Sequence, residues 1–445
     1  MPKRSSRILI SATSSNVGKT LFVSALLEVL KFSNTHSFKC GPDYIDPMYH
    51  EAVLGITSKN LDPFFMDENL MKASFLEDAG DINIIEGCMG LYDGLGVTSK
   101  CSTYEVAQNL RTPVVLLVDA AKAGYSIVAA IKGYQSLDTD NLIKGVILNR
   151  ISEGYYKKLS KVIEEECGIK TLGYMPVIKE STFESRHLGL KSVEENNAKE
   201  IVHLVSLIIK DTVDIDGILD VAESAEHLVY DKKLADYVSC NATEEKPLIA
   251  VAKDEAFNFL YKDNLWALAM CGADIVYFSP LWDEKLPENV KGVVIPGGYP
   301  ELYAKQLSDN KSMLESIRAA AEKGMPVIAE CGGYMYLQRA IEIENKAFGM
   351  VGIFDGIAKN KGKLVRFGYI EATNEAYKIK GHEFHHFDVD NPGEDFDIVK
   401  ASDRNIKYKA VESYKNVTAG FPHLFYLSDT RFIADFIDKA INYDK

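Results

Sequence analysis

The most constraining feature of this sequence is a cysteine between a short apolar run and two glycines, in residues 326–337 (PVIAECGGYMYL). The apolar run is typical of a buried strand, and the pattern after the glycines is typical of an amphipathic helix. The glycines allow a sharp turn and a close approach to a ligand. We therefore expect a strand–turn–helix unit that presents Cys331 as a nucleophile.

The position of Cys331 also favours nucleophilic chemistry. The N–H groups at a helix N-terminus carry partial positive charge, which favours a thiolate. The same groups would stabilise an oxyanion once the sulfur attacks a carbonyl. A buried structural cysteine is the alternative for this residue taken alone, because free cysteine is among the most buried residue types.

Length and composition narrow the class of protein. A chain of 445 residues is too long to fold around one ordinary hydrophobic core, so two or three domains are expected. The net charge of -14 argues against a nucleic-acid partner, whose phosphates would be repelled. Seven cysteines without CxxC pairs predict neither a disulfide framework nor a zinc site, and we expect reduced thiols in the cytoplasm. We find no apolar run that would span a membrane and no signal peptide.

Buried-strand candidates alternate with helical stretches in the first half of the chain. These candidates are residues 7–12, 82–86, 114–119 and 145–149. Continuous apolar strands in such alternation predict a parallel sheet covered on both faces. A polar break at 239–246 separates this region, 1–238, from a second strand–helix series in 247–445. We expect an α/β protein of two parallel-sheet domains.

The first strand is followed by residues 12–20 (ATSSNVGKT), which resemble a P-loop. Its backbone N–H groups would bind a phosphate at the start of the next helix, Lys19 would reach the outer phosphates, and Thr20 would bind Mg²⁺. The standard first glycine is replaced by Thr13, and in the longer dethiobiotin-synthetase-like spacing by Ala12. An ordinary strand–loop–helix turn is the alternative.

Acidic side chains mark two further turns of the same region. Asp43 and Asp46 lie around a proline-stiffened turn in residues 39–47, and Glu86 ends an expected strand. Ligands of open α/β sheets bind at the carboxyl ends of the strands. Carboxylates there would hold Mg²⁺ opposite the phosphate loop.

Taken together, the motifs resemble those of the cobyrinic acid a,c-diamide synthase family, over nearly the whole chain. In the first half they are KCGPDYIDPMYH (39–50), NLDPFF (60–65), EGCMGLYDG (86–94), GVILNR (145–150) and RHLGL (186–190). In the second half they are DEAFNF (254–259), PGGYPEL (296–302), AECGGYMYL (329–337) and GHEFHH (381–386), with His423.

This resemblance implies an N-terminal dethiobiotin-synthetase-like ATPase domain and a C-terminal class I glutamine amidotransferase domain of the triad type. The family amidates the a and c carboxylates of cobyrinic acid in cobalamin biosynthesis, with ATP and with glutamine or ammonia. The chain would then be a carbon–nitrogen ligase that converts each carboxylate to an acyl phosphate before ammonia attacks it.

The resemblance also implies roles for residues of the amidotransferase domain. Cys331 would attack the glutamine carboxamide, and His423 would be the general base and acid. Gly298 and Gly332 would offer backbone N–H groups to the oxyanion.

In the ATPase domain, the implied Mg²⁺ ligands are Thr20, Asp43 and Glu86. Asp46 and Asp93 would position substrate or metal. The nucleotide would be bound by Ser15, Asn16, Val17, Gly18, Lys19, Thr20, Lys39 and Asn149.

The surroundings of His423 depart from the family pattern. The family has Tyr-x-His, but here the sequence is Phe-Pro-His. Related triad amidotransferases carry a glutamate after the histidine, whereas residues 424–426 (LFY) offer none. We therefore expect a backbone carbonyl or a remote side chain to orient the base. His382, His385 and His386 make a poor metal site, because strand neighbours point to opposite faces; we expect structural or substrate-edge contacts.

Two other functions remain open from the sequence. The same chemistry could act on nickel-sirohydrochlorin, since the motifs do not separate the two substrates. Less in keeping with the motifs, the chain could be a P-loop switch ATPase with an inactive amidotransferase domain. The expected partners are a tetrapyrrole, glutamine, ATP and Mg²⁺, with no nucleic acid and no membrane. A homodimer, the order of amidation and the ammonia path are left open.

Overall fold

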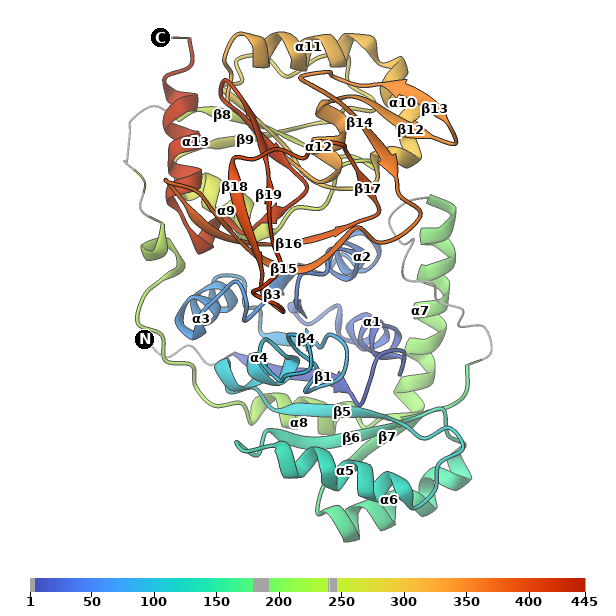
Figure 1. The fold of residues 1–445 in the computed structure, drawn as a ribbon. Coiled ribbons are helices and arrows are strands. Elements are labelled where there is room, and N and C mark those ends of the chain that lie inside the picture. The colour runs from blue at the N-terminus through green and yellow to red at the C-terminus, as the bar shows by residue number, and fades with distance from the viewer. Residues whose placement is uncertain (1–4, 179–191, 239, 241–245, 445) are drawn as a thin grey trace. The chain divides into compact units, whose positions relative to one another are not determined.

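A computed structural model describes residues 5–178, 192–238, 240 and 246–444. The chain divides into two compact units, Met1–Leu234 and Ala235–Lys445 (Figure 1). Each unit has its own sheets and is described by itself. Among the described residues, no helix has the length and apolar character needed to cross a membrane.

The first unit is built on a seven-stranded sheet with the order β3-β2-β4-β1-β5-β6-β7 (Figure 1). Its strands are β1 Ser6–Ala12, β2 Thr35–Cys40, β3 Ser58–Leu61, β4 Ile82–Glu86, β5 Val114–Asp119, β6 Ile143–Asn149 and β7 Lys170–Met175. All neighbouring strands are parallel, which confirms the predicted sheet. The chain leaves β1 toward β2 on one side and leaves β4 toward β5 on the other. In open α/β sheets, ligands bind at such a reversal, which here lies at the carboxyl ends of β1 and β4.

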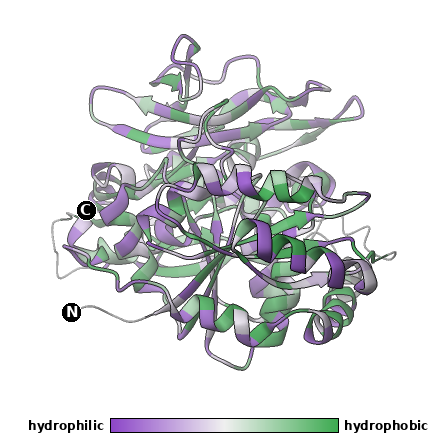
Figure 2. Ribbon diagram, turned by 90° about the horizontal axis from the view of Figure 1, so that it is seen from below, coloured by the Kyte–Doolittle hydropathy of each residue, from purple (hydrophilic) through white to green (hydrophobic). Residues whose placement is uncertain are grey.

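Helices connect these strands and cover the sheet. They are α1 Lys19–Leu30, α2 Ile45–Leu54, α3 Glu68–Glu77, α4 Thr103–Asn109, α5 Ser126–Leu137, α6 Glu153–Cys167, α7 Ser192–Thr212 and α8 Ile215–Glu223. Helix α1 is apolar on most of its surface because it packs on β1 and also on α7, where Phe22 and Leu26 share a core with Val202 and Val205. The parallel strands are correspondingly rich in hydrophobic residues, whereas many helices have a polar face (Figure 2).

The second unit contains a six-stranded sheet with the order β20-β21-β11-β10-β8-β9. These strands are β8 Leu248–Ala252, β9 Asp274–Phe278, β10 Gly292–Ile295, β11 Val327–Glu330, β20 Glu412–Tyr414 and β21 Val417–Gly420. Only β20 runs antiparallel to its neighbour in this sheet, so the predicted parallel sheet is again present. Its helices are α9 Lys262–Met270, α10 Ala304–Asp309, α11 Lys311–Glu322, α12 Gly332–Leu337 and α13 Arg431–Ile441, and short 3₁₀ turns are η2 Leu234–Tyr237, η3 Pro300–Tyr303 and η4 Tyr426–Ser428.

Two smaller sheets complete the second unit. One has the order β13-β12-β14-β17 and the other β19-β18-β15-β16-β22. Their strands are β12 Gln338–Ile343, β13 Lys346–Gly349, β14 Phe354–Asn360, β15 Arg366–Thr373, β16 Lys378–His385, β17 Phe387–Asp388, β18 Phe396–Lys400, β19 Lys407–Ala410 and β22 His423–Leu424. The last strand matters for the site, because it carries His423 and pairs with β16.

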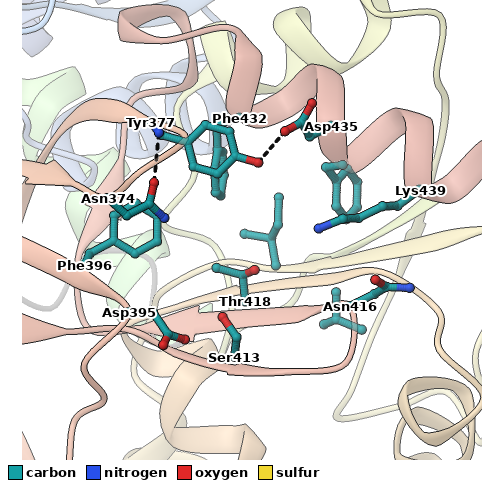
Figure 3. A pocket seen from close by; sticks show the side chains of 13 residues that line it. Asn374, Tyr377, Asp395, Phe396, Ser413, Asn416, Thr418, Phe432, Asp435 and Lys439 are labelled. Carbon is teal, nitrogen blue, oxygen red and sulfur yellow. Dashed lines mark hydrogen bonds between the residues drawn. The ribbon is translucent and has the colours of Figure 1, made fainter.

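A cavity of about 150 Å³ lies between helix α13 and the strands of the second unit (Figure 3). Tyr377 and Asp435 border it, and the Tyr377 hydroxyl donates a hydrogen bond to Asp435 Oδ2 at 2.5 Å. The cavity is also lined by Val327 and Ile328, the first residues of β11. Because Cys331 follows the other end of β11, this cavity is separate from the predicted nucleophile.

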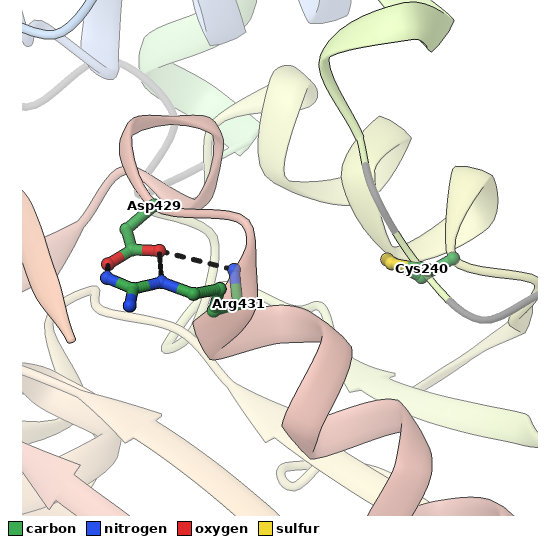
Figure 4. Close-up of a disulfide and its surroundings, with 4 residues drawn as sticks. Cys240, Asp429 and Arg431 are labelled. Carbon is green, nitrogen blue, oxygen red and sulfur yellow. Dashed lines mark hydrogen bonds and ion pairs between the residues drawn. A yellow bond between two sulfur atoms is a disulfide. The ribbon is translucent and has the colours of Figure 1, made fainter. Parts of the chain in front are cut away.

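The structure joins Cys240 and Cys271 in a disulfide, with their Cα atoms 5.2 Å apart (Figure 4). Cys271 is the C-cap residue of α9. The prediction that all thiols are reduced is therefore wrong for this pair, because spacing along the sequence does not reveal which Cα atoms approach each other. The described part of the chain contains all seven cysteines, and the other five form no disulfide there.

Candidate active sites

The phosphate-loop candidate connects the end of β1 to the start of α1. Gly18, the N-cap of α1, has φ 89°, a conformation that favours glycine. A Cβ atom there would also lie 2.8 Å from Nδ2 of Asn149. That amide donates a hydrogen bond to the carbonyl of Val17 at 2.6 Å, so the end of β6 holds the loop. Ser15 and Asn16 are exposed at its tip. The loop thus ends at a helix N-terminus, which suits an anion.

Lys19 and Thr20 extend from this loop toward two neighbouring turns. Lys19 Nζ donates to the carbonyls of Ser14, at 3.2 Å, and Met89. Burial lowers the pKa of Lys19, and the charge of nearby Lys39 lowers it further. Thr20 Oγ1 donates to Glu86 Oε1 at 2.8 Å. The first turn of α1 is therefore linked directly to the carboxyl end of β4.

A buried lysine lies at the centre of the acidic cluster. Lys39 Nζ contacts Asp46 Oδ2 and lies 2.8 Å from Glu86 Oε1 and 3.8 Å from Asp43 Oδ2. Burial opposes its charged form, but Asp46 and Glu86 outweigh burial, and the pKa of Lys39 is raised well above its ordinary value. Burial, followed by the charge of Asp46, raises the pKa of Glu86 to about 7. Lys39 thus stays charged; its charge keeps the pKa of Asp46 below the ordinary value and offsets only part of the effect of burial on Glu86.

The cluster offers oxygen donors of the kind that Mg²⁺ prefers. Within the described residues, Glu86 Oε2 is fully buried and makes no hydrogen bond, and His50 Nε2 lies 3.8 Å from it. Burial lowers the pKa of His50 to about 4, so its ring is neutral. No group of three or more His, Cys, Asp or Glu side chains is placed to hold a metal in this part of the chain. Thr20 contacts both Asp46 and Glu86, so three side chains offer oxygen atoms of the kind that Mg²⁺ prefers, and binding of the ion there stays a prediction.

The structure brings together most of the residues that the sequence singled out in the first unit. Asp43 is a third exposed at the edge of the cluster, where its Oδ1 accepts the N–H of Ile45 at 2.9 Å. Asp93 is exposed and accepts the N–H of Gly90 at 2.9 Å, so it caps its own turn. The motif at 186–190 lies outside the described residues.

Cys331 occupies the predicted turn between β11 and α12. Its backbone has φ 48° and ψ −104°, a strained conformation for a residue with a side chain. Helix α12 follows directly and packs so closely on β10 that a Cβ atom at Gly333 would lie 2.1 Å from the carbonyl oxygen of Ile295. The expected strand–turn–helix unit is confirmed, and the second glycine is required by this close approach.

Two glycine amides lie beside the nucleophile. A Cβ atom at Gly332 would lie 3.0 Å from the backbone nitrogen of Gly298, so the two turns are in contact. Gly298 has φ 156°, and a Cβ atom there would lie 2.1 Å from the carbonyl oxygen of Ala256. The structure brings together the two residues predicted to donate to an oxyanion, and that role stays a prediction.

His423 lies against the same turn. A Cβ atom at Gly297 would lie 2.3 Å from Cε1 of His423. On the neighbouring strand, the ring of His382 stacks on that of His423, with centroids 4.8 Å apart. Burial lowers the pKa of His423 well below its ordinary value, and His382 and His385 lower it further. The resting imidazole is therefore neutral.

The thiol of Cys331 is also neutral at rest. Burial raises its pKa, the charge of Glu301 raises it further, and the N–H of Gly332 offsets only part of this. The N–H of Gly332, at the start of α12, lowers the pKa of Cys331 in the direction that the sequence predicts, but burial outweighs this effect in the resting site. Helix α12 has only six residues, and the loss of water around the sulfur outweighs its partial charge.

The histidines of the GHEFHH motif have separate surroundings. Nδ1 of His382 lies 3.1 Å from the hydroxyl of Tyr261, and burial lowers the pKa of His382 to about 3. His385 is buried and stacks on Phe421 with centroids 4.1 Å apart, whereas His386 is exposed. This confirms that the adjacent histidines face opposite sides. The motif identified His382, but no local signal revealed that it stacks on His423.

Comparison with known proteins assigns a class to each unit. Residues 248–431 match the family model of the CobB/CobQ-like glutamine amidotransferase domain, and residues 6–185 match that of an AAA domain. With the geometry above, this pair of domains defines a ligase that takes nitrogen from glutamine and uses ATP.

Full-length relatives narrow the class to one family. The cobyrinate a,c-diamide synthase of Caldanaerobacter subterraneus is 39% identical over 98% of this chain and 99% of its own length. That of Clostridium acetobutylicum is 41% identical over 96% of this chain and 98% of its own, and that of Listeria innocua 41% over 85% and 86%. The chain belongs to the cobyrinate a,c-diamide synthase family.

Proposed function

We propose that this chain amidates the a and c carboxylates of cobyrinic acid, with ATP and glutamine, in cobalamin biosynthesis. The observation that carries the proposal is that one chain combines a phosphate loop facing an acidic cluster with a cysteine elbow beside a neutral histidine. Relatives named cobyrinate a,c-diamide synthase match both units. We further propose that the domains are 1–238 and 247–445, joined by the linker 239–246, and that the enzyme is cytoplasmic.

In the second unit, glutamine hydrolysis begins with Cys331. Its sulfur attacks the side-chain carboxamide carbon while the thiol proton passes to His423. The N–H groups of Gly298 and Gly332 stabilise the negative oxygen that forms. His423 then gives its proton to the departing nitrogen, the C–N bond breaks, and ammonia leaves a thioester. Water hydrolyses the thioester to glutamate and restores the thiol.

In the first unit, ATP activates the carboxylate of the tetrapyrrole. A carboxylate oxygen attacks the γ-phosphorus and ADP leaves, giving an acyl phosphate. The loop 15–20, held by Asn149, binds the phosphates, and Lys19 neutralises their charge. Ammonia then attacks the acyl carbon, phosphate leaves, and the amide nitrogen loses a proton.

A Mg²⁺ ion would complete this site. Thr20 and Glu86, with Asp43 or Asp46, would hold it, and it would neutralise charge on the phosphate oxygens. Lys39 lowers the pKa of these carboxyl groups and so offsets part of the effect of their burial in the absence of the ion. Asp93 is exposed in the turn after β4, and we propose that it positions the substrate.

The proposal is tested by incubating the purified protein with ATP, Mg²⁺ and glutamine, and with either cobyrinic acid or nickel-sirohydrochlorin. Mass spectrometry of the tetrapyrrole should show two amide groups on cobyrinic acid. Amidation of the nickel compound alone would keep the chemistry and change the substrate. Binding of ATP without amidation of either compound, and without glutamine hydrolysis, would favour a switch ATPase instead.

A further inference from the structure

The structure shows what holds the backbone that follows His423. Residues 424–426, called here the histidine-flanking segment, contain no acidic side chain that could orient the base. Two buried polar side chains from distant parts of the sequence bind this segment instead. They are Asn264, on helix α9, and Glu330, the last residue of β11.

Asn264 binds the segment on both sides of Phe425. Its Nδ2 donates to the carbonyl of Leu424 at 2.8 Å, and its Oδ1 accepts the N–H of Tyr426 at 2.9 Å. The side chain is fully buried, so water does not compete for these bonds. One amide therefore satisfies a donor and an acceptor of the segment at once, and both bonds depend on a single side-chain orientation.

Glu330 binds the segment at the residue next to the base. Its Oε1 accepts the N–H of Leu424 at 3.2 Å. Glu330 immediately precedes Cys331, and Leu424 immediately follows His423. The carboxyl group is therefore one residue from the nucleophile and binds the chain one residue from the base. Burial raises the pKa of Glu330 to about 8, although Leu424 and Tyr426 favour its charged form, so the group is mostly a neutral acid at pH 7.

Loss of either side chain would therefore affect the position of His423 relative to Cys331. The elbow is fixed on its other side as well, because the N–H of Cys331 donates to the carbonyl of Gly420 at 2.8 Å. Strand β22, which carries His423, has only two residues, and β16 borders it on one side. Such a short strand depends on additional bonds for its position, and Asn264 and Glu330 supply them.

We propose that Asn264 and Glu330 are positioning residues that hold His423 in place relative to Cys331. They take the part that a glutamate after the histidine plays in related triad amidotransferases, but they act on the backbone rather than on the imidazole. This inference rests on glutamine hydrolysis by the second unit and does not depend on which tetrapyrrole is amidated.

The test measures glutamine hydrolysis, with ATP and Mg²⁺ present, by the full-length protein and its variants. In Asn264→Ala and Glu330→Ala, kcat should fall by about tenfold to hundredfold, because a displacement of about 1 Å has effects of that size. KM for glutamine should stay within about twofold, because neither side chain is proposed to touch the substrate. Glu330→Gln should restore most of kcat, since its amide oxygen still accepts the N–H of Leu424.

A matched control is Asn416→Ala. Nδ2 of Asn416 donates to the carbonyl of Gly324 at 2.7 Å, at the other end of β11 from Cys331. It removes the same kind of side chain–backbone bond, and glutamine hydrolysis should remain at the wild-type level. Amidation driven by added ammonia should be unchanged in all of these variants, which shows that the first unit is intact.

Unchanged kcat in folded Asn264→Ala and Glu330→Ala proteins would overturn the proposal, and so would Glu330→Gln that is as slow as Glu330→Ala. If the alanine variants do not fold, Asn264→Asp decides, because it keeps the shape and loses the donor to Leu424. Wild-type kcat in that variant would contradict the proposal, and a lowered kcat would support it.

A wild-type protein that hydrolyses glutamine but amidates neither tetrapyrrole would refute only the proposed substrate. A wild type without any glutamine hydrolysis would refute both proposals.

Discussion

The two candidate sites differ in how their side chains are charged at rest. In the first unit, Lys39 is buried against Asp46 and Glu86, and its pKa is raised well above the ordinary value. In the second unit, burial leaves Cys331 as a thiol and His423 as a neutral imidazole. One site is held together by ionised groups, and the other contains groups that are uncharged until a substrate reacts.

This difference follows from the chemistry proposed for each site. Transfer of a phosphoryl group moves charge that is already present, so fixed opposite charges are useful before the substrate arrives. Attack by a thiol requires a proton to move from sulfur to imidazole, so both groups must begin in their neutral forms. The comparison therefore predicts that each site can be disabled separately.

The largest effect is expected from Cys331→Ala. Glutamine-driven amidation should fall by more than about 10³-fold, because no other side chain replaces the nucleophile. Amidation with added ammonia should continue at the wild-type rate. Loss of the ammonia-driven reaction in a folded variant, followed by product mass, would show that the two sites are not separable.

The reciprocal change is Lys19→Ala. We expect ATP-dependent amidation to fall by about 10²- to 10³-fold with either nitrogen source, because a preorganised charge on the phosphates is lost. Basal hydrolysis of glutamine to glutamate, assayed by glutamate release with ATP present, should remain. Amidation at the wild-type rate would mean that Lys19 does not bind the phosphates.

Lys39→Met tests the charge cluster through stability. Removing the lysine leaves Asp46 and Glu86 as buried carboxylates without their cation, which should lower the free energy of unfolding by about 3–5 kcal/mol. The control is Lys170→Met, which breaks an exposed 2.8 Å ion pair with Asp214 and should have little effect because water screens it. Urea unfolding in the absence of nucleotide would give both values; equal effects would contradict the account of the cluster.

The last prediction concerns the pH dependence of stability at Glu330. Its pKa is about 8 in the folded protein and about 4.3 when unfolded, so the folded state binds more protons between these values. The group's contribution to stability is therefore present at low pH and is lost as pH rises from about 4.3 to 8. Glu330→Gln does not titrate, so its stability should rise relative to wild type over this range. Urea unfolding at several pH values measures the difference, and parallel curves would contradict the pKa of Glu330.

Much of the fold could be predicted from the sequence because its parallel strands are short apolar runs. The expected strand 82–86 coincides with β4, and 7–12 lies within β1. The turn at Cys331 was predictable because neighbouring glycines mark it. These signals are local, because a continuous apolar run within one segment is enough to indicate a buried strand.

Contacts between distant residues could not be predicted in the same way. The stacking of His382 on His423 depends on the pairing of β16 with β22, and no pattern in either segment specifies that pairing. The sequence placed Lys39 near phosphate but did not show that it pairs with Glu86, 47 residues away. The helix N-terminus at Cys331 was recognised correctly, whereas the burial that keeps the thiol neutral depends on the folded core.

The most direct test of the account is to follow nitrogen from glutamine into the product. The wild-type protein would receive cobyrinic acid, ATP, Mg²⁺ and glutamine labelled with ¹⁵N in its side-chain amide, and the product would be analysed by mass spectrometry. We predict a diamide that carries ¹⁵N at both new amides, and an unlabelled diamide from Cys331→Ala supplied with ordinary ammonia. Unlabelled product from the wild type, or no amidation of cobyrinic acid with either nitrogen source, would contradict it.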